Sequence, residues 1–184
     1  MPHSQPGWID DEQWVQLQRL VPITCVDLVP FRRRPDVVEF GLIERDSPFG
    51  QRWCQIGGRL RHGETLRSGL LRHLQHTLIG LDVELSADPQ PEHVMQWFPR
   101  IPDDGVDHGF DPRQHAVALC FLAEAALDVV PSVVEGGEAL RFGWFPVDEV
   151  GELGERAWPG TAAMIRAISR KLPPPASVRP APNT

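Results

Sequence analysis

The sequence has no tyrosine, a single lysine and only three cysteines. The cysteines, Cys25, Cys54 and Cys120, are odd in number and far apart, and none has a Cys-x-x-Cys or Cys/His ligand spacing. This pattern argues against a disulfide framework and against a structural zinc site. We therefore expect reduced thiols and a cytoplasmic protein.

Long apolar runs are also missing. The longest apolar stretch, residues 116–127, is far shorter than the ~20 residues that cross a bilayer. Residues 1–10 lack the basic segment and the apolar run of a signal peptide. The formal net charge of −7 does not favour binding to nucleic acid or to an anionic membrane surface. We expect neither of these as a partner.

The length and the hydrophobic content of the chain are sufficient for about one domain. Its 184 residues are 41% hydrophobic, which is enough for one core. We expect a single domain over residues 1–172. Residues 173–184 contain five prolines and no apolar periodicity, so they predict a disordered tail.

Helices and strands are expected to alternate along the chain. Asp10 or Asp11 is a suitable N-cap for a helix over about residues 10–20. Further helices are expected over residues 66–79 and 158–171. The β-branched and aromatic runs predict strands over residues 23–29, 37–45, 53–56, 93–98, 116–125 and 139–146. This order predicts an α/β or α+β domain.

One segment has the composition of a phosphate site. Gly58, Glu64 and Arg72 are separated by five and seven residues, and a second glycine, Gly57, comes directly before them. A Gly-Gly turn lets the backbone approach a pyrophosphate closely. The helix that follows has an apolar face at helical spacing, formed by Leu66, Leu70, Leu71, Leu74 and Leu78.

This segment resembles the Nudix box, here residues 58–81. The resemblance implies the Nudix fold, in which a mixed β-sheet is sandwiched between helices. In that family, glutamates on one face of the box helix hold Mg²⁺ or Mn²⁺ against the phosphates of the substrate. The matching positions here are His73, His76 and Thr77. The resemblance implies a divalent metal, but the box is degenerate because none of these three side chains is a carboxylate.

Within the superfamily, the chain is most similar to the branch of the GDP-mannose mannosyl hydrolases, whose box is also damaged. Three residues match substrate positions of that branch: Asp27 in the first strand, Arg45 at the end of the second, and Arg59 after the two glycines. With Arg72 of the box, the resemblance implies four substrate-binding residues. Arg59 is implied in catalysis as well, since a guanidinium offsets the charge of a departing diphosphate.

Gln114 and His115 match a metal-ligand glutamine and the histidine general base of the same branch. Taken alone, His115 is equally compatible with a solvated strand edge. The resemblance implies a catalytic set of His115, Arg59 and Glu64. It also implies the Gly57 carbonyl, Gln114 and Glu64 as metal ligands. We add His76 to this set, because imidazole suits softer ions.

Three functions stay open at this point. The first is a Nudix-like hydrolase of a nucleoside diphosphate linked to another group, such as a nucleotide sugar. The second is a catalytically inactive Nudix domain that binds a nucleotide or phosphate ligand as a sensor, through an arginine set that needs no metal: Arg45, Arg59, Arg61 and Arg72. The third is a structural role without a ligand. Resemblance to the branch implies a homodimer, and contact through the N-terminal helix is compatible with one.

Overall fold

The computed structural model describes residues 9–173. The tail predicted over residues 173–184 therefore lies, except for Pro173, outside the described residues. None of the helices in the described range has the length and apolarity needed to cross a membrane.

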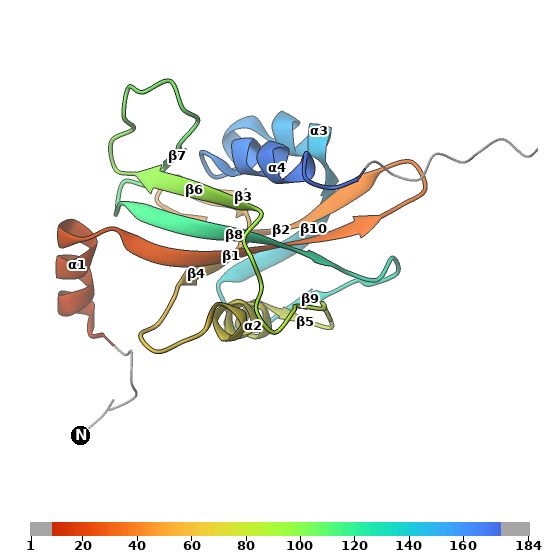
Figure 1. Ribbon diagram of the computed structural model, residues 1–184, viewed down its shortest axis with the longest axis horizontal. Coiled ribbons are helices and arrows are strands. Elements are labelled where there is room, and N and C mark those ends of the chain that lie inside the picture. Colours follow the sequence, from red (N-terminus) through yellow and green to blue (C-terminus); the bar gives the residue numbers. More distant parts are fainter. Residues whose placement is uncertain (1–8, 174–184) are drawn as a thin grey trace, which may run out of the picture.

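A twisted mixed sheet forms the centre of the molecule, and helices cover both of its faces (Figure 1). Helix α2 lies on one face and helices α3 and α4 on the other, while α1 lies at one end of the sheet. The helices are α1 (Asp11–Leu20), α2 (Leu66–Thr77), α3 (Val147–Glu152) and α4 (Thr161–Ser169), with a 3-10 turn at Gly154–Arg156.

The main sheet has the strand order β10-β2-β1-β8-β6-β7. Strands β1 and β8 are parallel, and the other pairs on this path are antiparallel except β6 with β7. The bounds of these strands are β1 (Ile23–Arg33), β2 (Val38–Ser47), β6 (His93–Phe98), β7 (Gly109–Phe110), β8 (Ala116–Glu124) and β10 (Ala139–Pro146).

Strands β1 and β2 pair only at one end and then separate. They are in register from Phe31 with Phe40 to Arg33 with Val38. Beyond this, β1 pairs with β4 (Ile56–Arg59), and β2 pairs with β3 (Gly50–Cys54). We call the opening between β1–β4 and β2–β3 the strand fork. It leaves polar side chains of β1 and β2 facing a gap instead of each other.

The core occupies both faces of the sheet. On one face, Leu70 and Leu74 of α2 are buried, and α2 approaches β1 closely at Gly69, which has no side chain. On the other face, Met164 of α4 lies against Cys120 of β8, with the two sulfur atoms 3.4 Å apart. The predicted leucine face of the box helix is thus the face that packs on the sheet.

The ends of two predicted helices differ from the sequence-based expectation. The box helix ends at Thr77 because Leu78–Ile79 form strand β5 with β9 (Ser132–Val133). The last helix begins at Thr161 instead of residue 158, because Gly160 has a left-handed backbone with φ of 108°. Trp158 is therefore a loop residue, and its indole Nε1 donates a hydrogen bond of 3.1 Å to Phe110 O.

Candidate nucleotide-binding pocket

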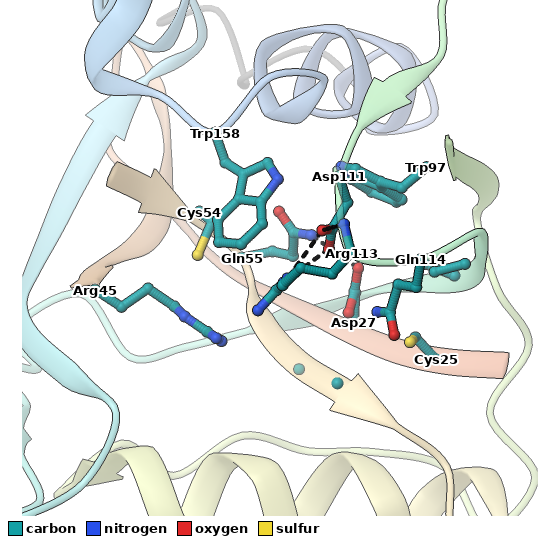
Figure 2. Close-up of a pocket in the computed structure, with 14 residues that line it drawn as sticks. Cys25, Asp27, Arg45, Cys54, Gln55, Trp97, Asp111, Arg113, Gln114 and Trp158 are labelled. Atoms are coloured by element: carbon teal, nitrogen blue, oxygen red, sulfur yellow. Dashed lines mark hydrogen bonds and ion pairs between the residues drawn. The ribbon is translucent and has the colours of Figure 1, made fainter. Parts of the chain in front are cut away.

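The strand fork contains a pocket, which we call the fork pocket (Figure 2). Strands β1, β2 and β4, the β3–β4 link, the loop before β8 and the loop before α4 all contribute to it. Two tryptophans, two alanines and two thiols make much of its wall apolar. The polar lining comes from Asp27, Arg45, Gln55, Asp111, Arg113 and Gln114, together with the backbone of Gly57 and Gly58.

Arg45 extends from β2 into the fork pocket (Figure 2). Its terminal nitrogen donates to a carboxylate oxygen of Glu138, which precedes β10. Its Nε atom is buried and has no hydrogen-bond partner within the described residues. A buried donor without an acceptor costs about 1–3 kcal/mol. The guanidinium is therefore only partly satisfied and faces the pocket.

Arg113 supplies a second guanidinium, from the loop between β7 and β8. It forms a two-pronged ion pair with Asp111, with N–O distances of 2.9 Å and 2.7 Å. Arg113 and Arg45 both lie near the ring of Trp158, with guanidinium carbons 5.1 Å and 5.7 Å from its centroid. An indole is thus flanked by two cations at the pocket wall.

Asp27 is the buried carboxyl of the fork pocket. It belongs to β1, and its Oδ2 accepts a hydrogen bond of 2.8 Å from Gln55 Nε2. The Oε1 of Gln55 in turn accepts a bond of 3.3 Å from the hydroxyl of Thr161 on α4. Burial raises the pKa of Asp27 to about 7, and Glu138 adds to this effect, while Gln55 and Arg45 oppose it. Asp27 is therefore divided between its charged and neutral forms at neutral pH.

Gly57 lies directly opposite Asp27 in the pairing of β4 with β1. A Cβ at residue 57 would overlap the carbonyl oxygen of Val26 and the carboxylate of Asp27, and it would lie 2.8 Å from Asp27 Cα. On the other side of the chain, a Cβ at Gly58 would lie 2.9 Å from the ring of His73. The two glycines therefore make room for the neighbouring strand and helix as well as for any ligand.

An ion pair inside the box holds the loop that follows the glycines. Arg72 of α2 donates to both carboxylate oxygens of Glu64, at 2.6 Å and 2.8 Å, and to Arg59 O at 3.1 Å. The backbone N–H of Arg61 also donates to Glu64, at 2.9 Å. These bonds, chiefly those from Arg72, lower the pKa of Glu64 to about 2. Glu64 and Arg72 thus bind each other, and the sequence-based roles in catalysis and substrate binding stay predictions for them.

The box helix does not present a set of donors that fits a hard divalent cation. His73 is half-buried, with Nε2 3.2 Å from Arg59 O, and burial and the neighbouring Arg72 lower its pKa to about 4. The hydroxyl of Thr77 is buried and donates to His73 O at 2.7 Å. His76 is exposed. Magnesium and manganese prefer anionic and carbonyl oxygens, and these side chains offer none. Residues 9–173 contain no group of three acidic, histidine or cysteine side chains placed for a metal.

Two further predicted residues lie at the rim of the fork pocket or beyond it. The guanidinium of Arg59 stacks on Trp14 of α1, with its carbon 4.6 Å from the ring centroid. Burial, together with Arg61 and Arg72, lowers the pKa of Arg59. Gln114 lines the pocket, but its Oε1 accepts a bond of 2.8 Å from Gln18 of α1. Helix α1 is therefore attached both to the box loop and to the pocket wall.

The structure does not bring His115 into the fork pocket. Side chains alternate along β8, and the pocket takes Gln114, Ala116 and Ala118 from this part of the chain. His115 stacks on Phe98, with ring centroids 4.3 Å apart, and its Nε2 is 3.3 Å from Gln96 Oε1. A ligand in the fork pocket would therefore not contact His115, and the general-base role of this histidine stays a prediction.

Sequence reasoning missed Gln55, Arg113 and Trp158 as residues of this pocket. All of them lie in links between helices and strands, and no spacing distinguishes them from other loop residues. Trp158 was predicted to belong to a helix. Only the fold, which closes the loops before β8 and α4 over the strand fork, brings these side chains to Asp27 and Arg45.

Solved structures with the same arrangement belong to Nudix proteins. A protein of Jonesia denitrificans described as a possible asymmetric diadenosine tetraphosphate hydrolase is 27% identical, with 84% of this chain and 98% of that one covered and a TM-score of 0.67. The Nudix domain of Shewanella oneidensis NrtR, solved with ADP ribose, is 17% identical over 90% and 100% of the two chains, with a TM-score of 0.56. The MutT protein of Methanosarcina mazei is 17% identical over 83% and 96%, with a TM-score of 0.56. The chain has the Nudix fold, as the sequence predicts.

Within this fold class, the chain belongs to the family described as a domain of unknown function, DUF4916, whose model matches residues 4–168. No curated protein sequence matches the chain. The similarity to the mannosyl hydrolase branch stays a prediction.

The ion pair of the box loop predicts a response of stability to acid. Because the folded pKa of Glu64 is depressed, its stabilisation is present above the ordinary carboxyl pKa near 4.5 and is lost as pH falls towards about 2. Arg72→Ala should lower the unfolding free energy by about 2 kcal/mol at neutral pH and weaken this acid dependence. Urea unfolding at several pH values measures both effects. Arg67→Ala, an exposed arginine of the same helix, is the control. Equal acid dependence in wild type and Arg72→Ala would contradict the assignment.

The close approach of Gly57 to β1 predicts a cost for any side chain there. Gly57→Ala should lower the unfolding free energy by about 1–3 kcal/mol, because the added methyl overlaps the backbone of the neighbouring strand. Gly151→Ala in α3 is the control, since a Cβ there meets only the end of Arg166 at 4.0 Å. Chemical denaturation compares the two variants, and similar values for both would show that residue 57 tolerates a side chain.

Proposed function

We propose that this protein binds a nucleoside diphosphate conjugate in the fork pocket without needing a divalent metal. The observation that carries this proposal is the pair of arginines beside Trp158, one of which has a buried Nε donor without an acceptor. Arginine forks bind phosphate oxygens in two-point contacts. A bound phosphate would offer further acceptors to the guanidinium nitrogens that face the pocket, and the unpaired Nε shows that the hydrogen-bonding capacity of Arg45 is not fully used by the described residues.

The wall of the fork pocket supports a nucleoside as the rest of the ligand. Trp97 and Trp158 line it together with Ala116 and Ala118, so indole rings and methyl groups form the apolar part of the wall. Indoles bind nucleobases by stacking, which contributes about 1–3 kcal/mol per base. The NrtR domain of the same fold was solved with ADP ribose, which is a nucleoside diphosphate conjugate.

Arginine charge explains why a metal is dispensable for binding. In a site with carboxylates, a divalent cation is needed between them and the phosphates. Here none of the three positions on the box helix is a carboxylate, and the carboxylates near the arginines are already paired with them. The two guanidiniums can therefore contact the phosphates directly.

Hydrolysis of the bound conjugate is the second candidate function. It is favoured by the box loop, in which the glycines and the Glu64–Arg72 ion pair are in place. A nucleotide sugar is one substrate class for this candidate.

Binding and turnover can be separated in one experiment. Titration with ADP-ribose, GDP-mannose and diadenosine tetraphosphate, with Mg²⁺ or with EDTA, is followed by intrinsic fluorescence, which arises from tryptophan alone because the chain has no tyrosine. At least one ligand should bind equally well in EDTA, and Arg45→Ala should weaken it about tenfold or more. Arg141→Ala, an arginine paired with Glu44 outside the pocket, is the matched control.

Chromatography of the same samples shows whether product forms. Product that requires Mg²⁺ would favour the hydrolase. Binding that is lost in EDTA, or that is equally weakened by Arg141→Ala, would contradict metal-free binding at Arg45.

The contact of Arg45 with Glu138 predicts a variant with tighter binding. Glu138 competes with the ligand phosphate for the same guanidinium and repels its charge. Glu138→Gln should therefore raise the affinity of the ligand that binds in the previous titration, by roughly threefold to tenfold. Glu44→Gln, which alters the matched pair with Arg141, should leave the affinity unchanged. Weaker binding by Glu138→Gln would show that this carboxylate positions Arg45 for the ligand instead of competing with it.

A further inference from the structure

Asp27 has one oxygen in use and one available to the fork pocket. Its Oδ2 accepts the bond from Gln55, whereas Oδ1 has no hydrogen-bond partner among the described residues. We propose that Asp27 determines specificity, by accepting a hydrogen bond at Oδ1 from an N–H group of the nucleobase, which enters the pocket ahead of its phosphates. This inference rests on the proposed function and adds the orientation of the ligand.

The position of Asp27 is fixed by a chain of two hydrogen bonds, and a specificity residue requires such fixing. Gln55 holds Oδ2, and the hydroxyl of Thr161 on α4 holds Gln55 in turn. The Oδ1 atom lies against the backbone of Gly57, where any Cβ would overlap it. The carboxyl therefore cannot turn away without losing its bond to Gln55. A fixed acceptor rejects ligands that lack a donor, because a polar group left unpaired in a buried site costs free energy.

The distribution of charge sets the direction in which the ligand enters. The buried carboxyl of Asp27 lies beside the apolar wall, with Cys25 and Cys54 nearby. An anionic phosphate placed there would be repelled and would lose its hydration. The two guanidiniums, Arg45 and Arg113, are the cations of the same pocket, and Arg113 is partly exposed. The base is therefore expected at Asp27 and the phosphates at the arginines.

Such a contact couples binding to protonation. The charged or titratable groups facing Asp27 are the thiols of its own and neighbouring strands and two arginine–carboxylate pairs: Cys25, Cys54 and Cys120, Arg45 with Glu138, and Arg113 with Asp111. From α2, His73 lies across Gly58. Burial raises the pKa of Cys54 to about 12 and those of the other two thiols as well, so the thiols stay neutral near pH 7. Asp27, with its pKa of about 7, changes charge near neutrality.

The sign of the coupling follows from the donor. An N–H of the base bonds to the carboxylate and favours its charged form, so the ligand lowers the pKa of Asp27. Binding then releases a proton below about pH 7, and the affinity rises with pH and levels off above about 7. A protonated Asp27 that donates to the ligand would give the opposite sign on both counts.

Calorimetry of the full chain with ADP-ribose and with GDP-mannose tests this. Neither ligand has a terminal phosphate that titrates near neutrality, so proton exchange reports on the protein. Titrations at about pH 6.5 in two buffers with different ionisation enthalpies give the number of protons released. We expect a fraction of one proton to be released and an affinity that rises about threefold or more from about pH 6 to about pH 8. Proton uptake, or no exchange with either ligand that binds, would overturn the proposal.

Asp27→Asn is the matched variant, because it keeps the size of the side chain and removes the titration. It should abolish the proton release and weaken binding about tenfold at about pH 8. Circular dichroism checks that it folds, and the wild-type calorimetry gives a result even if it does not. A variant that folds, binds as tightly as the wild type and still releases protons would overturn the assignment of Asp27.

The orientation of the base has its own test. ADP and purine riboside 5′-diphosphate differ only in the exocyclic amino group, so at about pH 8 the analogue should bind several-fold more weakly to the wild type and equally to Asp27→Asn. Equal binding of both ligands to the wild type would place the base elsewhere. This result can be distinguished from failure of the proposed function. If the proposed function is wrong, no ligand of the panel binds, and the inference about Asp27 is then wrong as well.

Discussion

The exchange of partners by β1 is the constraint on which the pocket depends. The first part of this strand forms hydrogen bonds with β4, and its last three residues pair with β2. Because a strand edge can pair with only one neighbour at a time, β2 must diverge wherever β4 is present, and it then takes β3 as its partner. The divergence places Asp27 and Arg45 on opposite walls of one opening. The loops before β8 and α4 close the opening with Arg113 and Trp158.

The box has two parts that depend on different interactions. Its loop is held by Arg72, which bonds to Glu64 and to the backbone of the loop, and this part retains the predicted motif. The helix face has a different character, because Thr77 bonds to its own helix and His73 packs beneath Gly58. Arg72 and His73 of the helix both bond to Arg59 O of the loop, but none of these contacts needs a carboxylate on the helix face. The loop can therefore retain its shape while the helix face has no oxygen ligands for a hard cation.

The sequence was informative wherever a pattern reflects local geometry. The leucine period predicted the buried face of α2, the spacing of Gly58, Glu64 and Arg72 predicted the fold, and Asp10 caps α1 as expected. The site was harder to predict, since it depends on contacts between distant segments. Asp27 and Arg45 do line one pocket, but Arg113 and Trp158 come from loops without a periodic signal. Gln114 lines the pocket, but the adjacent His115 faces away from the pocket, because successive side chains of a strand point to opposite faces.

Gly57 shows how a motif residue can be retained for a reason unrelated to the motif's chemistry. Any larger residue there would collide with the backbone of Val26 and with Asp27. Natural selection for a folded chain would therefore retain the glycine in descendants that never meet a pyrophosphate. Among relatives of this protein, an invariant glycine at residue 57 would therefore indicate only that the sheet is retained. Variation at residues 27, 45 and 113 would be better evidence that the ligand has changed.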